Sequence, residues 1–469
     1  NMNNAYKVVF NKARGALMVA NEVTSSVQKK GTKLVVAAAV LAVAGAVYAA
    51  DASNASTSPI TISSGESVTI NPEDFANYSK GINIDGGQVT VNNYDGSFKF
   101  SAPKKNQNTV LNINGGKVTS FGSFDIGYGK INIDDVTVSG VNSADGYGAI
   151  LIMDTQSNSD GKEDGVLWKD SQPENHGLHV TNSHFLNNKT SWVGAAITVY
   201  DTALIEKTEF TGNAVTTVDD GGGAVALGGH GKVVIKDSTF TENTSASIGG
   251  AIATRPVNKS VGDNERYGGS YLEVYGTTFT KNSATGDASQ TYDYYKRTIG
   301  AGGAIWLGAK GTLWNGTAIA DHPNVIQNST FTENTATSYG GAIYNEGNLI
   351  ISGTDALTGN KAGKQGGAIY QFGNSLTLDA TASIDKITFS GNTAGGSAND
   401  VYLANVPDGT TNFRGENAAT LTLKGAGTIS FDGGIAGDKE TSITSSAATV
   451  TVKSMKDFSG STSIRDGSF

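Results

Sequence analysis

Cysteine is absent from this 469-residue chain, and proline is scarce, with 7 residues against 61 glycines. Without cysteine no disulfide bond can staple the fold, so its stability has to come from packing. So little proline excludes a collagen or a proline-rich linker. The chain is also poor in leucine and shows no long amphipathic helix pattern after residue 50. Its many Thr, Ser and Asn residues and short alternating segments predict a nearly all-β protein.

A two-part motif recurs through the middle of the chain. Its first half is Phe-x-x-Asn, and its second half is Gly-Gly-Ala-Ile or a close variant. In the copies that begin at Phe240, Phe331 and Leu357 the two halves start nine positions apart, whereas other copies contain insertions. Such recurrence indicates one supersecondary unit stacked on copies of itself. The first half lies at 185–188, 210–213, 240–243, 279–282, 331–334, 357–360 and 389–392, and the second at 194–197, 222–225, 249–252, 302–305, 340–343 and 366–369.

Each residue type in the motif has a physical role in a coil of short parallel strands. A Phe at one fixed point of every rung can stack on the Phe of the next rung, because neighbouring strands lie about 4.8 Å apart. The Asn suits a turn, because it tolerates the left-handed conformation and its amide can bond the matching Asn of the next rung as a ladder. Paired glycines suit a corner where a Cβ atom would clash. We therefore predict a parallel β-helix in which Phe240, Phe331 and Phe389 are buried in one stack.

The first 49 residues differ from the rest. Six basic residues precede an apolar run over 34–47, which ends in the small-residue pattern Val47-Tyr48-Ala49. This pattern is typical of a signal peptide, and we expect cleavage after Ala49 or at the neighbouring Ala50. Cleavage after Ala49 removes six basic residues and one acidic residue, so the net charge falls from −9 to −14. A mature chain this acidic is poorly suited to bind nucleic acid.

Two segments resemble known families. Residues 2–17, with 19–24 and the basic stretch at Lys29, Lys30 and Lys33, resemble the extended signal peptide region of Gram-negative type V secretion proteins. The paired motif, from residue 185 to about 404, is similar to that of polymorphic outer membrane proteins and related autotransporter passengers, which form right-handed parallel β-helices. The resemblance implies export through the Sec translocon and an outer-membrane translocator barrel. It also implies a location at the outer membrane surface or outside a Gram-negative cell, which a cysteine-free chain can reach without a disulfide blocking its passage.

The expected fold is thus an all-β, right-handed parallel β-helix solenoid with loop insertions, preceded by a helical signal peptide. Insertions are expected at 154–177, 255–269 and 285–298. Because only short alternating segments follow residue 404, we expect either truncation before a translocator barrel or a passenger whose barrel lies elsewhere. The expected parts are an extended signal peptide over 1–49, a linker over 50–59, atypical amino-terminal rungs over 60–150, the repeat-bearing β-helix over 151–404 and further rungs over 405–469.

Motifs for catalysis or cofactor binding are missing from the sequence. It contains no Gly-x-Ser-x-Gly, His-Glu-x-x-His, P-loop or EF-hand pattern, so we expect no enzyme, no cofactor and no metal site. His176 and His179 could lie near each other, but no further ligand motif accompanies them. The pairs Asp134-Asp135 and Asp219-Asp220 are the candidates for a β-helix polysaccharide lyase or hydrolase, which is the alternative function. The non-catalytic interpretation of Asp219-Asp220 is a solvated acidic turn.

One insertion is a candidate binding element. It carries Tyr292, Tyr294 and Tyr295, followed by Lys296 and Arg297, a composition that is enriched in recognition surfaces. The alternative is that these tyrosines pack back on the flank of the coil. We expect a secreted or surface-displayed passenger that acts in adhesion or surface interaction, with a host or bacterial surface receptor or glycan as partner. A two-partner-secreted exoprotein would share the long signal peptide, but of its Asn-Pro-Asn motifs only Asn71-Pro72 occurs here.

Overall fold

The computed structural model describes residues 6–11, 16–21, 57–102, 108–119, 123–124, 129–143, 148–152, 177–199, 202–218, 220–228, 232–254, 270–292, 296–309, 323–410, 413 and 415–469. The chain divides into two units, Asn1–Gly45 and Ala46–Phe469. The insertions expected at 154–177 and 255–269 lie outside the described residues, except for Gly177.

In the first unit, strands β1 (Tyr6–Asn11) and β2 (Ala16–Asn21) form an antiparallel pair. The expectation of a helical signal peptide is therefore wrong for these residues. The first strand contains Tyr6, Val8, Val9 and Phe10, and the second contains Val19; aromatic and β-branched residues of this kind favour strands. The apolar run over 34–47 and the cleavage positions Ala49 and Ala50 lie outside the described residues.

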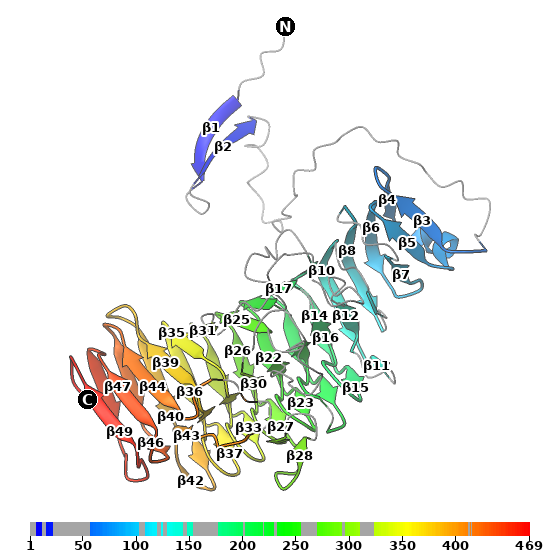
Figure 1. The fold of residues 1–469 in the computed structure, drawn as a ribbon. Coiled ribbons are helices and arrows are strands. Elements are labelled where there is room, and N and C mark those ends of the chain that lie inside the picture. The colour runs from blue at the N-terminus through cyan, green and yellow to red at the C-terminus, as the bar shows by residue number, and fades with distance from the viewer. Residues whose placement is uncertain are drawn as a thin grey trace. The chain divides into compact units, whose positions relative to one another are not determined.

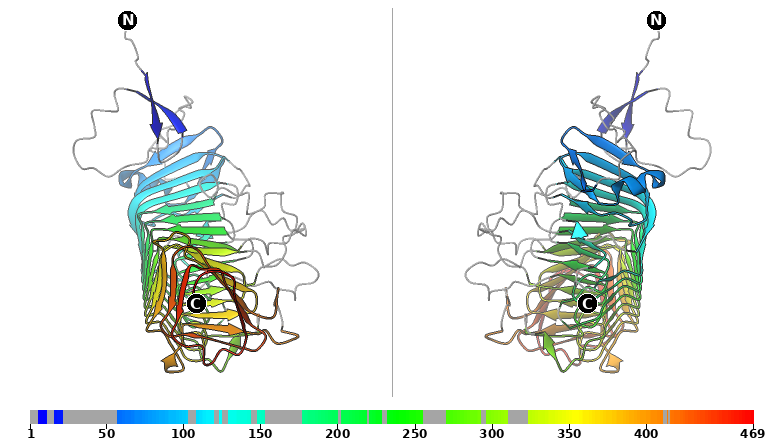
Figure 2. Two further views of the ribbon diagram at one scale, coloured as in Figure 1. Left: turned by 90° about the vertical axis from the view of Figure 1, so that its left-hand side faces the viewer. Right: turned by 90° about the vertical axis from the view of Figure 1, so that its right-hand side faces the viewer.

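The second unit is a coil of parallel strands that stack in columns along its axis (Figures 1 and 2). The first column holds fourteen strands in continuous parallel register. Because each strand pairs with the strand one turn further along the chain, neighbouring rungs are joined by backbone hydrogen bonds. These strands are β4 (Ser67–Ile70), β6 (Gln88–Tyr94), β8 (Val110–Val118), β10 (Lys130–Ser139), β13 (Gly177–Thr181), β17 (Thr202–Glu206), β21 (Lys232–Lys236), β25 (Tyr271–Tyr275), β31 (Asn324–Gln327), β35 (Leu349–Ser352), β39 (Ser375–Asp379), β44 (Thr420–Lys424), β47 (Ser442–Ser445) and β49 (Ser461–Ile464).

The second column carries the Phe of the motif and begins with the carboxy-terminal halves of β8 and β10. The third column consists of two-residue strands that follow the Asn. The second column continues with β14 (His184–Leu186), β18 (Glu209–Thr211), β22 (Thr239–Thr241), β26 (Thr278–Thr280), β32 (Thr330–Thr332), β36 (Asp355–Thr358), β40 (Lys386–Ser390), β45 (Thr428–Phe431) and β48 (Thr449–Val452); the third comprises β11 (Asn142–Ser143), β15 (Lys189–Thr190), β19 (Ala214–Val215), β23 (Thr244–Ser245), β27 (Ser283–Ala284), β33 (Thr335–Ala336), β37 (Lys361–Ala362), β41 (Thr393–Ala394) and the antiparallel β42 (Ser397–Ala398).

The fourth column carries the Ala-Ile half of the motif and closes each turn of the coil. Four parallel columns around one apolar interior confirm the predicted all-β solenoid; its right-handed sense stays a prediction. The fourth-column strands are β9 (Ser123–Phe124), β12 (Ile150–Ile152), β16 (Ile197–Val199), β20 (Val225–Leu227), β24 (Ile252–Thr254), β30 (Ile305–Leu307), β34 (Ile343–Asn345), β38 (Ile369–Phe372), β43 (Val401–Ala404) and β46 (Ile435–Gly437).

The amino-terminal rungs contain an aromatic cluster instead of the full motif. Strands β3 (Ile60–Ser63), β5 (Ile82–Asp85) and β7 (Phe100–Ser101) pair in parallel there, next to the 3₁₀ helix η2 (Pro72–Tyr78). Phe75 and Tyr78 of this helix pack on Phe98, with ring centroids 5.4 and 6.0 Å apart. Asn71 is the N-cap of this helix, and Pro72 is its first residue. Within the described part of the chain, no helix is long and apolar enough to cross a bilayer.

The motif phenylalanines form one interior column, as predicted. The rings of Phe185, Phe210, Phe240, Phe279 and Phe331 stack in succession, with centroids 4.5 to 5.1 Å apart, and none of them is exposed to solvent. Leu357 takes the next place in register, and Phe389 and Phe431 follow with centroids 4.8 Å apart. The stack of rings is thus interrupted once, by an aliphatic side chain of the same column.

The motif asparagines form a buried ladder beside this column. In each rung from Asn188 to Asn360, the backbone N–H and the side-chain Nδ2 both donate to Oδ1 of the next asparagine; at Asn243 these distances to Asn282 are 3.0 and 2.9 Å. From Asn213 onward, Nδ2 also donates to a Phe or Leu carbonyl, as Asn243 does to Phe210 at 2.9 Å. The left-handed conformation of this turn lies one residue before the Asn, as at Glu242 with φ 54°. The residue before each Asn, such as the exposed Glu242, therefore makes the turn. The Asn itself is buried, and its amide can join the ladder.

A second ladder of polar side chains runs along the other end of the second column, and the sequence analysis missed it. The backbone N–H of Ser183 donates to Oγ1 of Thr208, and the same bond repeats through Ser238, Thr277 and Ser329 with distances of 3.2 to 3.4 Å. The ladder ends where the N–H of Ser329 donates to Oδ1 of Asp355 at 2.7 Å. The signal that could have revealed it is the Ser or Thr two positions before the Phe of the first five copies, from Phe185 to Phe331.

The paired glycines are required by close backbone contacts. Gly340 has a φ of 67°, and a Cβ atom on it would lie 2.2 Å from the carbonyl oxygen of Ile343. On Gly341 a Cβ atom would lie 2.1 Å from the carbonyl oxygen of Gly367 in the next rung. Because real Cβ atoms do not approach backbone oxygens so closely, the expectation of a corner that excludes side chains is confirmed.

Candidate functional site

The tyrosine-bearing insertion forms a small hairpin outside the coil. Strand β28 (Thr291–Tyr292) pairs antiparallel with β29 (Arg297–Thr298), and Figure 1 shows β28 protruding from the stacked columns. The side chain of Tyr292 and both Tyr294 and Tyr295 lie outside the described part of the structure. Lys296 is exposed and takes a left-handed conformation with φ 54°. The described strands of this hairpin thus lie beside the stacked columns and not within them (Figure 1).

Arg297 is not at the surface of this hairpin, in contrast with the expectation that it offers a contact to a ligand. It is 5% exposed, and its Nε donates to Oε2 of the fully buried Glu346 at 2.8 Å. Tyr344 donates its hydroxyl to the same carboxylate at 3.1 Å. Burial lowers the pKa of Arg297, but the charges and hydrogen bonds of Glu346 and Tyr344 together raise it by more. The guanidinium group therefore stays charged and holds the hairpin against the coil.

Further bonds fix the base of the hairpin to the rungs that follow it. Lys364 donates from Nζ to the carbonyl of Ala288 at 2.9 Å, and Ser338 donates to the carbonyl of Ile299 at 2.8 Å. Thr337 donates its hydroxyl to the carbonyl of Gly286. The base is thus held by side chains from two later rungs, and the solenoid helps to set its orientation.

A stack of aromatic side chains covers the outer face of the fourth column beside the hairpin. Trp306, Tyr344, Tyr370 and Tyr402 occupy successive outward positions, with centroids 5.3, 5.7 and 5.7 Å apart. The first three are at most 7% exposed, and they form a second apolar cluster apart from the interior. Arg297 lies 5.4 Å above the ring of Phe372 in this cluster. The sequence analysis missed this stack, although an aromatic residue directly after the Ile or Val of four rungs was a visible signal.

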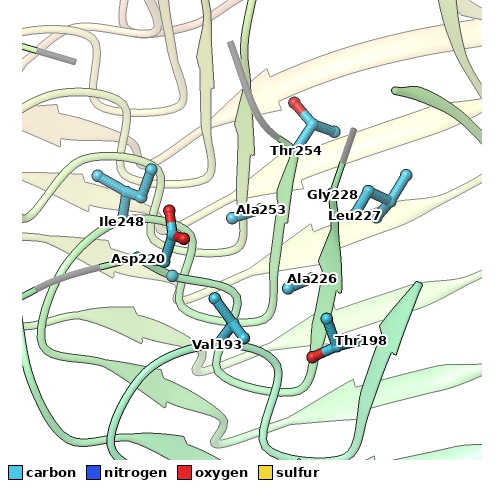
Figure 3. Close-up of a pocket in the computed structure, with 10 residues that line it drawn as sticks. Val193, Thr198, Asp220, Ala226, Leu227, Gly228, Ile248, Ala253 and Thr254 are labelled. Carbon is cyan, nitrogen blue, oxygen red and sulfur yellow. The ribbon is translucent and has the colours of Figure 1, made fainter. Parts of the chain in front are cut away.

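A shallow pocket lies on the same outer face, over the earlier rungs (Figure 3). There Thr198, Ala226 and Ala253 occupy the outward positions that Trp306 and the tyrosines take further on. The empty volume is about 270 Å³, including open solvent. Asp220 is 4% exposed and is the one acidic residue among the described lining, while Asp219 lies outside the described residues. A paired acid and base is therefore not assembled by the side chains described in this pocket.

The other candidate residues take part in bonds between rungs. Asp134 accepts hydrogen bonds from Oγ1 of Thr181 at 2.7 Å and from Nδ2 of Asn182 at 2.8 Å, while Asp135 adopts a left-handed turn with φ 56°. His179 pairs with Glu206 in the next rung, with Nε2 and Oε2 2.8 Å apart. His176 lies outside the described residues. In the described ranges, no three His, Cys, Asp or Glu side chains are grouped as metal ligands would be.

Two family models match the chain. Residues 2–50 match the extended signal peptide of the type V secretion system. Residues 237–255, 328–346 and 356–371 match the Chlamydia polymorphic membrane protein repeat. Neither a curated protein nor a solved structure gives a significant match.

These two matches and the solenoid define the class of the protein. The chain combines a signal like that of type V secretion autotransporters with repeats like those of polymorphic membrane proteins on a parallel β-solenoid. Its signal implies export through the Sec translocon and an outer-membrane translocator. The protein is accordingly secreted or displayed at the outer membrane surface of a Gram-negative bacterium.

Proposed function

We propose that the mature chain is a non-catalytic passenger that acts in adhesion or surface interaction. The observation that carries this proposal is the braced hairpin of β28 and β29 on a solenoid that has a type V secretion signal. A rigid scaffold that presents a projecting loop is a common arrangement for binding sites. The partner is a receptor or glycan on a host or bacterial surface.

The bonding of the motif residues supports a structural role for them. The Phe column and the Asn ladder are buried, and the glycine pairs are needed for close contact between rungs. Asp134 and His179 bond to neighbouring rungs, so these two candidate residues are engaged in holding the coil together. The net charge of −14 after signal removal further favours a partner other than nucleic acid.

Binding can be tested with the mature chain and two matched variants. In the first, Tyr292, Tyr294 and Tyr295 are replaced by Ser; in the second, Tyr271 and Tyr275, which lie on the coil face at β25, are replaced by Ser. We expect the first variant to lose at least about tenfold of its affinity for a cell or glycan surface, as loss of interface aromatics does. The second variant should bind like the wild type. Equal binding by all three proteins would place the interaction elsewhere on the coil.

A second assay separates the proposal from the lyase or hydrolase alternative. The mature chain is incubated with a panel of pectins and glycosaminoglycans in the presence of calcium, and unsaturated or reducing ends are measured. We expect no product. Product formation that disappears in an Asp219→Asn/Asp220→Asn double variant would replace the adhesin proposal with polysaccharide cleavage.

A further inference from the structure

The second ladder, which runs through Ser and Thr side chains from Thr208 to Ser329 and is here called the Ser/Thr ladder, ends on the buried carboxyl group of Asp355. In the rungs before it, a backbone N–H donates to the hydroxyl of Ser238, Thr277 or Ser329, and in the last step it donates to Oδ1 of Asp355. Asp355 is 1% exposed. The next rung places the buried Ile387 in register with it, so the ladder does not continue. A carboxyl group thus takes the place of a hydroxyl at one joint of the solenoid.

The second carboxyl oxygen of Asp355 distinguishes this joint from the end of the Asn ladder at Asp400. Oδ2 of Asp355 is buried and has no hydrogen-bond partner among the described residues. Asp400, which ends the Asn ladder, is different: its Oδ1 accepts from Nδ2 of Asn392 at 2.8 Å, and its Oδ2 accepts from the N–H groups of Gly433 and Gly434 at 2.7 and 3.1 Å. A buried charge is costly unless hydrogen bonds compensate it. Ionisation is therefore better compensated at Asp400 than at Asp355.

The charged groups around Asp355 do not offset this cost. Lys386 begins β40, which packs on β36, and Asp385 directly precedes this strand; Asp385 has the same sign of charge as an ionised Asp355, and Lys386 is exposed. Residues 328–332, on the other side, contain no titratable side chain. Burial raises the pKa of Asp355 to about 7, with a smaller contribution from Asp385, while the N–H groups of Ser329 and Asn328 act in the opposite direction.

We propose that Asp355 makes the joint between β32 and β36 a pH-sensitive point of the solenoid, closed while the carboxyl group is neutral and loosened when it ionises. Rungs of a solenoid contact only their neighbours, so one weakened joint can open locally. Opening there separates β32 and the rungs before it from β36 and the rungs after it. The joint responds within the neutral range, where an ordinary surface aspartate is already ionised.

Hydrogen exchange of the mature chain between pH 5 and pH 8, corrected for the intrinsic rate, tests this proposal. In the wild type we expect protection of residues 326–332 and 349–358 to fall roughly ten- to hundredfold over this range, with no such change in β22 and β26. Asp355→Ser restores the hydroxyl of the other rungs and should keep protection constant, as should Asp355→Asn. Asp385→Asn should retain the fall.

Three outcomes would overturn the proposal. The first is equal pH dependence in the joint and in the β22 and β26 rungs of the wild type. The second is a fall in protection that persists in both Asp355 variants. The third is a fall that vanishes in Asp385→Asn alone, because the titrating group would then be Asp385.

Discussion

At the scale of single residues, each motif asparagine satisfies its polar atoms without help from solvent. In Asn334, Nδ2 donates to Asn360 and to the carbonyl of Phe279, while Oδ1 accepts from the N–H and Nδ2 of Asn282. A buried amide that makes all of these bonds carries little desolvation cost. The column of rings beside it supplies the apolar contact. The Phe and the Asn therefore act together in the rungs that carry the full motif.

We expect Phe331→Ala to lower the free energy of unfolding by about 3–5 kcal/mol, the usual cost of removing a buried aromatic ring. Phe331 is not exposed and stacks on Phe279 with centroids 4.7 Å apart. Phe331→Leu is the matched control, because Leu357 holds the equivalent place in the next rung. Urea denaturation of the three proteins measures the difference, and an unchanged midpoint for the alanine variant would contradict the burial of this ring.

At the scale of elements, the corner between the third and fourth columns depends on the distance between backbones. The second glycine of each pair faces a carbonyl oxygen of the next rung, at 2.0 Å from the position of a Cβ on Gly303 and 2.1 Å on Gly341. The other turn, before the Asn, tolerates side chains: Gly359 is equivalent to Glu333, and both have positive φ. Glycine is thus required at one corner and optional at the other.

Gly341→Ala should therefore destabilise the coil by more than about 2 kcal/mol, since the backbone has to move apart. Gly359→Asn is the control, and it should change stability by less than about 1 kcal/mol, because Asn187 adopts the same conformation with φ 54°. Thermal unfolding followed by circular dichroism compares the two. Similar losses in both variants would mean that the corner has room for a Cβ atom.

At the scale of the whole molecule, stability should depend on pH through the two aspartates that end the ladders. Burial raises the pKa of Asp355 to about 7 and that of Asp400 to about 6, whereas an unfolded chain titrates near 3.8. The folded state then binds more protons than the unfolded state between these values. The contribution of each group is fully present below about pH 4 and is lost as the pH rises through about 6 to 7.

At pH 7.5, replacement of the two aspartates by asparagine should have opposite effects. Asp355→Asn removes a charge whose second oxygen has no partner, so the urea midpoint should rise. Asp400→Asn places an amide N–H₂ against the donors of Asn392 or Gly433 and Gly434, so stability should fall by about 1–3 kcal/mol. The rise should disappear at pH 4, where Asp355 is neutral. A fall in both variants at pH 7.5 would contradict the assignment of Asp355.

The sequence by itself determined the rungs and the contacts between equivalent residues. Phe240 and Phe279, or Asn243 and Asn282, are neighbours because a strand pairs with the next copy of itself, so a periodic pattern is enough to predict the contact. The glycine corners follow from the same repeat. The secretion class was also visible in the sequence, because its signal is a local segment.

Only the tertiary structure decided how irregular parts meet the coil. Arg297 binds Glu346, 49 positions away, and this contact depends on how an insertion folds back over later rungs, which no repeat encodes. The two ladders end at Asp355 and Asp400, where the repeat pattern is interrupted. An interrupted repeat does not predict which hydrogen bonds form in place of the ladder bonds. Burial then raises the pKa values of these aspartates, and burial is a property of the packed coil rather than of the residue type.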